Sequence, residues 1–163
     1  MEAVGNVYYN NNGVVVRASN IRDVEYVSQR MRESDRVEIM ASHRHSPCAA
    51  LSIALNDSIL CLTVEDNGEP LAMFGCNGKS VVGASGTIWL LATDALKKRQ
   101  LRFVRHTKYF VDLMLSYYPY LENWVDERNK ASIAWLKMSG AVIEDAKPYG
   151  LNGEKFHHFY FRR

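Results

Sequence analysis

The feature that most constrains the fold is a long helix set between two short apolar strands. Residues 87–94 (TIWLLATD) form an apolar run without polar alternation, which is typical of a strand buried on both faces. Residues 96–117 carry apolar side chains at helical spacing and end before Pro119, and residues 120–126 (YLENWVD) indicate a second strand. Because a crossover through a helix joins parallel strands, we predict a parallel pair inside the sheet.

Further apolar runs surround this unit and predict mostly antiparallel neighbours. Residues 59–64 and 70–76 flank Asp66-Asn67-Gly68, a turn signal typical of a β-hairpin. We therefore predict an α/β fold in which a central mixed sheet of about seven strands is flanked by four helices. The other predicted strands cover residues 13–19, 141–144 and 155–161, and the other predicted helices cover residues 21–32, 47–55 and 129–139.

The chain is long enough for one hydrophobic core and short for a second. It has 163 residues, of which 47% are hydrophobic and 23% are charged, so we predict a single domain over residues 13–163. The Asn-rich residues 1–12 are expected to form a poorly ordered arm. No apolar run approaches the roughly 18 residues of a membrane helix, and the first residues lack a secretion-signal pattern. We expect a cytosolic protein with no membrane partner.

One late helix carries a spacing that is characteristic of a known family. The pattern Asn-x-x-Ala-x-x-x-Tyr-x-x-x-Gly-Phe is matched in register by Asn129, Ser132, Leu136, Gly140 and Ala141. Asn129 is expected to cap this helix and Gly140 to provide its left-handed exit. With the order of the predicted elements, this spacing resembles the GCN5-related N-acetyltransferase (GNAT) fold over residues 14–161. The segments EPLAMFG, WLLATD and YLENWVDERNKASIAWLKMSGAVI also resemble acetyltransferase-like internal virion proteins of short-tailed bacteriophages.

The resemblance implies a cleft that binds acetyl-CoA. In the family the two parallel strands part and backbone groups of the first strand bind the pantetheine arm, which places the cleft between Trp89–Thr93 and Glu122–Val125. The next helix begins at Asp94 and points its amino end at the pyrophosphate, as expected for anion binding at a helix start. The resemblance implies cofactor binding by Leu91, Ala92, Thr93, Asn129 and Ser132. We add Lys97, Lys98 and Arg99 of the first turn as candidates for the phosphates.

The phosphate-binding segment departs from the family. The family places glycines there so that backbone amides approach the phosphates, whereas residues 92–106 contain no glycine. Two interpretations stay open for the basic residues of this helix: an ordinary solvated face, or binding of phosphate from a coenzyme or, more weakly, from a nucleic acid. The net charge of +2 does not indicate a general polyanion binder. The basic residues are Lys97, Lys98, Arg99, Arg102, Arg105 and Lys108, with no acidic residue between Ala95 and Val111.

The catalytic groups depart from the family as well. Acetyl transfer needs a base for the amine and an acid for the leaving thiolate. Leu136 occupies the position of the family's tyrosine acid, which leaves Tyr149 or a water as a replacement. Glu122, Asp126 and Asp94 are the candidate bases, although Asp94 is rather expected to cap the long helix and Glu122 equally suits a solvent-facing position.

Histidine, cysteine and tryptophan patterns do not favour a metal or an aromatic binding platform. His43 and His45 lie near Cys48 but do not complete a set of four ligands, so no metal is predicted. In the resembled fold this segment lies over the acceptor end of the cleft, which favours contact with substrate instead. The three tryptophans, Trp89, Trp124 and Trp135, are expected in the core.

Two functions are consistent with this pattern. The first is an N-acetyltransferase of phage origin that moves an acetyl group from acetyl-CoA to an unknown amine, with a host protein as a candidate acceptor. The alternative is a non-catalytic internal virion, ejection or host-interaction protein that keeps the scaffold and contacts virion components. We expect the protein in the host cytoplasm and, for the alternative, packaged in the virion.

Overall fold

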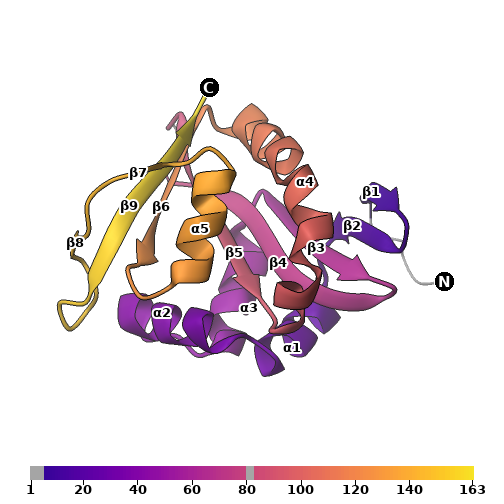
Figure 1. The fold of residues 1–163 in the computed structure, drawn as a ribbon, viewed down its shortest axis with the longest axis horizontal. Helices are drawn as coiled ribbons and strands as arrows, with labels where there is room; N and C mark the ends of the chain where they lie inside the picture. The colour runs from indigo at the N-terminus through magenta and orange to yellow at the C-terminus, as the bar shows by residue number, and fades with distance from the viewer. Residues whose placement is uncertain (1–5, 80–82) are drawn as a thin grey trace.

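The computed structural model describes residues 6–79 and 83–163, in which five helices flank one mixed sheet (Figure 1). The strands follow the order β1-β2-β3-β4-β5-β6-β9-β7, and β8 pairs with β9. The helices are α1 (Ile21–Gln29), α2 (Glu33–His43), α3 (Pro47–Asp57), α4 (Ala95–Tyr117) and α5 (Lys130–Met138). The strands are β1 (Val7–Asn11), β2 (Val14–Ala18), β3 (Leu60–Asp66), β4 (Glu69–Gly78), β5 (Ser85–Ala92), β6 (Tyr120–Asp126), β7 (Val142–Ile143), β8 (Lys147–Pro148) and β9 (Lys155–Arg162).

The predicted α/β fold is confirmed, with more elements than expected. The described residues form nine strands instead of about seven, and five helices instead of four. One extra strand, β1, lies inside the segment predicted to be a poorly ordered arm, so that prediction is wrong for residues 7–11. This strand pairs with β2, and Tyr8 and Tyr9 pack against the core, which outweighs the low strand propensity of the asparagines. Residues 1–5 of the predicted arm lie outside the described residues.

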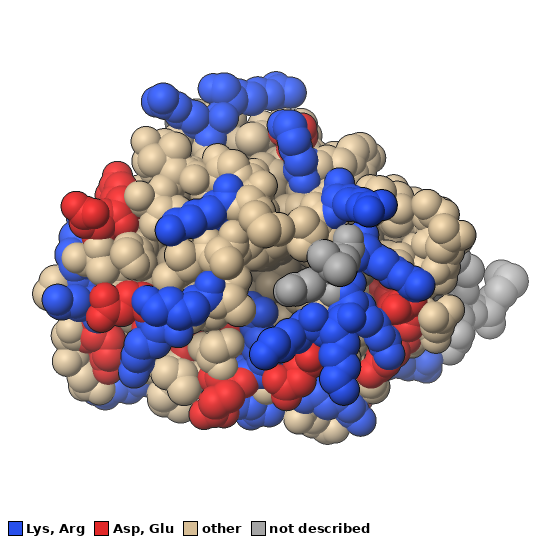
Figure 2. Space-filling model, in the orientation of Figure 1, with Lys and Arg blue, Asp and Glu red and all other residues tan. Residues whose placement is uncertain are grey.

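The helices form two layers, one on each face of the sheet. Met73 and Leu91 share a core with α1, α2 and α3, whereas Phe74 packs on the α4 residues Phe103 and Phe110, because neighbouring residues of a strand point to opposite faces. Lys and Arg side chains gather on the face that α4 and α5 cover (Figure 2). None of the described helices is long and apolar enough to cross a membrane.

The predicted turn between β3 and β4 and the predicted ends of α5 are confirmed. Asn67 and Gly68 both have positive φ, at 50° and 83°, as the tight turn between β3 and β4 requires. The side chain of Asn129 accepts a hydrogen bond from the backbone N–H of Ser132 and so caps α5. Gly140 has φ of 90° and ends the same helix in the left-handed conformation.

The parallel pair of β5 and β6 is joined over only part of its length. Ser85 pairs with Tyr120, and the last pair is Thr87 with Glu122. Both strands continue beyond that pair, β5 to Ala92 and β6 to Asp126, within the described part of the chain. The two strands therefore part toward their carboxyl ends, as the resemblance implies.

Candidate functional site

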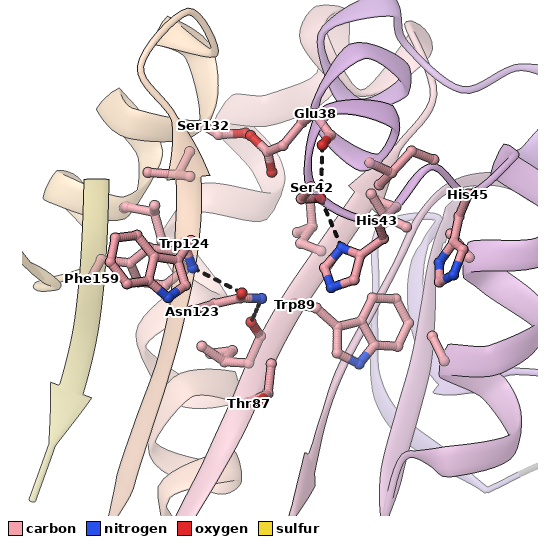
Figure 3. Close-up of a pocket in the computed structure, with 18 of the residues that line it drawn as sticks. Glu38, Ser42, His43, His45, Thr87, Trp89, Asn123, Trp124, Ser132 and Phe159 are labelled. Carbon is pink, nitrogen blue, oxygen red and sulfur yellow. Dashed lines mark hydrogen bonds between the residues drawn. The ribbon is translucent and has the colours of Figure 1, made fainter. Parts of the chain in front are cut away.

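A cleft of about 270 Å³ opens where β5 and β6 part (Figure 3). Trp89 of β5 and Trp124 of β6 stand on its two sides, with the side chain of Asn123 between them. The amide nitrogen of Asn123 donates a hydrogen bond to the carbonyl oxygen of Ile88 at 2.8 Å. The side chain of Asn123 thus binds β5 directly after the last backbone pair, Thr87 with Glu122, and the split begins at this point.

The hydrogen-bond pattern of β5 decides which backbone groups face the cleft. The backbone N–H of Thr93 donates to the carbonyl of Leu71 in β4 at 2.8 Å. Because the direction alternates along an antiparallel pair, Leu91 also turns its backbone groups to β4, while Leu90 and Ala92 turn theirs to β6. Of the three residues predicted to bind the pantetheine arm, Leu91, Ala92 and Thr93, only Ala92 points its backbone groups into the split.

Both backbone groups of Ala92 are bound by the start of α2. The N–H of Ala92 donates to Oδ2 of Asp35 at 2.9 Å, and the backbone N–H of Arg32 donates to the carbonyl of Ala92 at 2.9 Å. Arg32 is the N-cap residue of α2, and its Nε lies 2.8 Å from Oδ1 of Asp35. The first turn of α2 thus occupies the backbone groups of Ala92, which would otherwise be free to bind a ligand.

The same helix binds the start of α5. The amide nitrogen of Asn129 donates to Oδ1 of Asp35 at 3.2 Å and to Oε2 of Glu38 at 3.1 Å. The guanidinium of Arg32 donates to Oγ of Ser132 at 2.8 Å. The structure therefore brings Ala92, Asn129 and Ser132 together, as the sequence predicts, but their polar groups are satisfied by α2 and its N-cap.

Two carboxylates of α2 have perturbed protonation in this cluster. Burial raises the pKa of Asp35, although Arg32 and the donated N–H groups partly offset this effect. Burial and the neighbouring Asp35 raise the pKa of Glu38 to about 7, against the hydrogen bonds from the backbone N–H of Asp126 at 3.0 Å and from Asn129. Glu38 also lines the cleft (Figure 3), so it is a carboxyl group near its titration point beside an open space.

The opposite side of the cleft is closed by contacts between α4 and α5. The indole N–H of Trp135 donates to Oγ1 of Thr107 at 3.1 Å, and its ring centroid lies 5.8 Å from that of Phe103. Leu136 is buried and lines the cleft. A leucine has no proton to donate, so this position contributes only apolar surface.

The predicted base Glu122 lies at the closed end of the split. It forms a salt bridge with Lys79 and one with Nε2 of His158, the latter at 2.6 Å, and His158 also contacts Glu144 at 3.1 Å. Burial alone would raise the pKa of Glu122, but the hydrogen bonds from Lys79 and His158 hold that pKa below its ordinary value. A carboxylate held in its charged form by these two hydrogen bonds is a weak proton acceptor.

The other two predicted catalytic residues lie in different surroundings. Tyr149 lines the cleft, and its ring stacks on Trp124 with the centroids 4.2 Å apart. Burial raises the pKa of Tyr149. Asp94 is exposed at the start of α4, where its side chain forms no capping hydrogen bond, so the predicted cap is wrong. Its backbone is already helical, so its carboxylate points away from the backbone N–H groups of the first turn, whose hydrogen bonds a capping side chain must accept.

The predicted phosphate-binding residues split into two groups. Arg99 is bound to the hairpin between β3 and β4, where it lies 2.8 Å from Glu69 and 3.5 Å from Asp66. Lys97 and Lys98 are exposed. In the described part of the chain these two lysines have no ion-pair partner, so their charges face solvent.

Histidine and tryptophan side chains surround the open side of the cleft. His43 and His45 both line it, with ring centroids 5.5 Å apart, in agreement with the expected place of this segment. Burial, and then the neighbouring His45, lower the pKa of His43. Trp89 lines the cleft and also packs against the core, as Trp135 does, so the core prediction holds for these two. It is wrong for Trp124, which is a half-buried wall of the cleft.

One family model matches more than half of the chain and shows which family the protein belongs to. The family model described as "Bacteriophage T7, probable scaffold protein Gp13" matches residues 60–147. The chain is a member of this phage family. No curated protein matches the chain.

Solved structures with the same fold are N-acetyltransferases. Ard1 from Thermoplasma volcanium has a TM-score of 0.70 at 16% identity and covers 92% of this chain and 97% of its own. The ribosomal-protein-S18-alanine N-acetyltransferase from Escherichia coli has a TM-score of 0.63 at 16% identity, over 91% and 93% of the two chains. Spermidine N-acetyltransferase from Vibrio cholerae, solved with CoA and spermine, has 0.62 at 13%, over 93% and 96%. At these identities the similarity shows a GNAT fold in a phage protein.

The sequence interpretation missed the residues of α2 and its N-cap that bind Ala92, Asn129 and Ser132 beside the cleft. Arg32, Asp35 and Glu38 lie three positions apart and so share one side of a helix, which was a readable signal. The signal was overlooked because charged residues at this spacing usually face solvent. Asn123, which holds the split at Ile88, was also missed, since an asparagine within a strand run is not distinctive.

Proposed function

We propose that the chain is a non-catalytic GNAT-fold protein that acts in the assembly of the phage particle. The observation that carries the proposal is the set of hydrogen bonds from α2 and its N-cap into the cleft. Asp35 and Arg32 bind both backbone groups of Ala92, and the same helix binds Asn129 and Ser132. These are groups that the GNAT resemblance assigns to acetyl-CoA. A coenzyme would have to displace charge-assisted hydrogen bonds worth about 1.5–3 kcal/mol each.

Three further features support this proposal. The segment after β5 has no glycine to bring backbone amides close to a pyrophosphate, and Leu136 replaces a proton donor. Trp135 fills the space between α4 and α5 through its contacts with Thr107 and Phe103. The residues in this arrangement therefore do not fit the pantetheine arm of the coenzyme.

The phage family supports a role in the particle. Its description is that of a probable scaffold protein, and scaffold proteins work through contacts with other particle components, with no need for a reaction. We propose virion components as the partners of this chain and the assembling particle in the host cytoplasm as its location. Mass spectrometry of purified virions and of unfinished particles tests this, because the protein should be found in at least one of them. Its absence from both would contradict the proposal.

A thermal-shift measurement tests the closed cleft. The melting temperature should stay unchanged with 1 mM acetyl-CoA or 1 mM CoA, because we expect neither compound to bind. A ligand that did bind, present at a hundred times its Kd, would stabilise the fold by about 2.7 kcal/mol and raise the melting temperature. The spermidine N-acetyltransferase from Vibrio cholerae is a positive control. An increase that is lost in the Lys97→Glu, Lys98→Glu double variant would overturn the proposal, since it would place the coenzyme phosphates at the start of α4.

One observation favours the second candidate function, acetyl transfer to an amine. Glu38 lines the cleft with a pKa of about 7, which suits a proton acceptor at neutral pH. In this second proposal the first turn of α2 releases Ala92 when acetyl-CoA binds, while Glu38 stays at the cleft and serves as base in preference to Glu122 and Asp94. The test is the amine-dependent release of free CoA thiol with spermidine or an N-terminal peptide. Release that disappears in Glu38→Gln and persists in Glu122→Gln would establish this function and exclude the first.

A further inference from the structure

The helices α4 and α5 carry a marked excess of positive charge. They carry eight basic residues and a single acidic one, Asp112, whereas the whole chain has a net charge of only +2, so the rest of the sequence has a net charge of −5. Both helices lie on the face seen in Figure 2, where blue side chains gather over them. We call this surface the basic face. Its basic residues are Lys97, Lys98, Arg99, Arg102, Arg105, Lys108, Lys130 and Lys137.

Three exposed residues of the basic face lie in a row along α4. Lys98, Arg102 and Arg105 are exposed and follow the spacing i, i+4, i+7, which places them on one side of the helix over roughly 10 Å of its length. Arg102 lies 3.8 Å from Asp66. For Lys97, Lys98 and Arg105, no ion-pair partner is present among the described residues. Their positive charge is therefore available to an anion.

The position of these charges is unfavourable for the helix itself. The first turn of α4 contains no acidic residue, and Lys97 and Lys98 lie beside the positive end of the helix macrodipole. Basic residues at this end oppose the dipole, so helix stability does not explain them. A bound polyanion would, since its negative charge interacts favourably with both the lysines and the dipole.

The composition of the basic face fits a nucleic acid better than a protein. The centre of a protein interface is rich in aromatic residues and poor in lysine. On α4 and α5, the large apolar side chains that are exposed in the described residues are Tyr109, Tyr117 and Met138, all in the carboxyl-terminal halves of their helices. The amino-terminal half of α4 instead offers long, flexible cations, which suit the regularly spaced phosphates of a duplex.

We propose that the basic face binds double-stranded DNA through its phosphates, without reading the base sequence. A duplex carries one negative charge per about 1.7 Å of its axis, so a row of cations on a straight helix contacts several phosphates at once. The side chains on the row are lysine and arginine, which contact phosphates in any sequence. This inference does not depend on the proposed role in assembly, and neither result decides the other.

The test is a titration of the full chain with a fluorescent 30-base-pair duplex of random sequence. Binding should weaken by roughly 40-fold between 50 and 200 mM NaCl if three phosphates are contacted, because counterions are released. Two unrelated duplexes should bind equally. No binding at 50 mM NaCl would overturn the proposal, and so would binding that does not change with salt.

A pair of charge-matched variants locates the contact. The test variant is Lys97→Glu, Lys98→Glu, Arg105→Glu, and it should lose DNA binding by at least 100-fold while keeping or raising its melting temperature, since acidic residues favour a helix start. The control is Lys155→Glu, Arg162→Glu, Arg163→Glu, which changes the net charge equally at exposed sites of the β9 segment. Retention of binding in the control supports the proposal. Equal loss in both variants would show only a net-charge effect and overturn it.

Two competitors separate DNA from other anions. Poly-glutamate of matched charge should compete at least tenfold more weakly than unlabelled duplex. Competition as strong as that of DNA would replace the proposal with an acidic protein partner. Acetyl-CoA at 1 mM should leave DNA binding unchanged, so a negative result for DNA stays distinct from any result for the coenzyme.

Discussion

The cleft and the basic face use the same kinds of charged residue in opposite ways. Beside the cleft, Asp35 is buried and Arg32 and Glu38 are half-buried, and every one of them has partners from distant parts of the chain. On the basic face, Lys97 and Lys98 are exposed and unpaired within the described residues. Since an enclosed ion is tolerated only when it is paired, the first group serves the fold. An exposed, unpaired charge costs the fold little and remains available for binding.

The largest expected effect comes from breaking the enclosed cluster. Asp35→Ala removes the acceptor of the N–H of Ala92 and the carboxylate partner of Arg32, and it leaves Asn129 only Glu38 as an acceptor. It should reduce the free energy of unfolding by about 3–5 kcal/mol. Urea unfolding at pH 7 measures it. The exposed Asp112→Ala on α4 is the control and should cost less than about 1 kcal/mol. Equal effects would contradict the contrast between the two regions.

A smaller effect, dependent on pH, is expected for Glu38→Gln. The folded-state pKa of about 7 exceeds the ordinary value of 4.5, so the wild type should lose stability as the pH rises from about 4.5 to 7. Glutamine resembles the protonated form and keeps an acceptor for Asn129, so the variant should be more stable than wild type by about 1–2 kcal/mol at pH 8 and equal to it at pH 4.5. Asp35, Asp126 and Arg32 face the same group and remain unchanged. Parallel pH profiles of the two proteins would refute this expectation.

Trp135→Phe tests whether the contacts between α4 and α5, like those of α2, contribute to stability and exclude the coenzyme. The variant keeps an aromatic ring beside Phe103 but loses the hydrogen bond to Thr107, and we expect a loss of about 1 kcal/mol in the free energy of unfolding. The melting temperature should still not respond to acetyl-CoA, because the start of α2 continues to bind both backbone groups of Ala92. A response to the coenzyme in this variant alone would identify Trp135 as the principal obstacle.

The smallest effect, and one of opposite sign, is expected on the basic face. Lys97→Glu places a negative charge in the first turn of α4 and should stabilise the fold by about 0.3–1 kcal/mol at low salt. Chemical unfolding at 20 and 500 mM NaCl measures it, and the gain should shrink at the higher concentration. A destabilised variant would show that Lys97 is part of the fold.

Periodicity was enough to predict the elements around the split. The β5–α4–β6 crossover and the cap at Asn129 are local features, because strand runs, helix faces and caps are written in neighbouring residues. The helix α2 was missed because its buried side is polar: Asp35 looks solvated until its partners Ala92 and Asn129, 57 and 94 positions away, are known. The predicted split between β5 and β6 was therefore present. The contacts of α2 beside it join distant parts of the chain, and no local pattern contains them.

The strand order has a consequence for synthesis of the protein. Strand β9 lies between β6 and β7, both of which precede it in the chain. Until Lys155–Arg162 leaves the ribosome, the side of β6 remains an open edge that invites pairing with other nascent chains. Arg32 likewise waits for Ser132, 100 positions later, before its guanidinium is matched. The sheet is thus completed only after β9 has been synthesised, which favours cooperative folding over stepwise growth from the amino terminus.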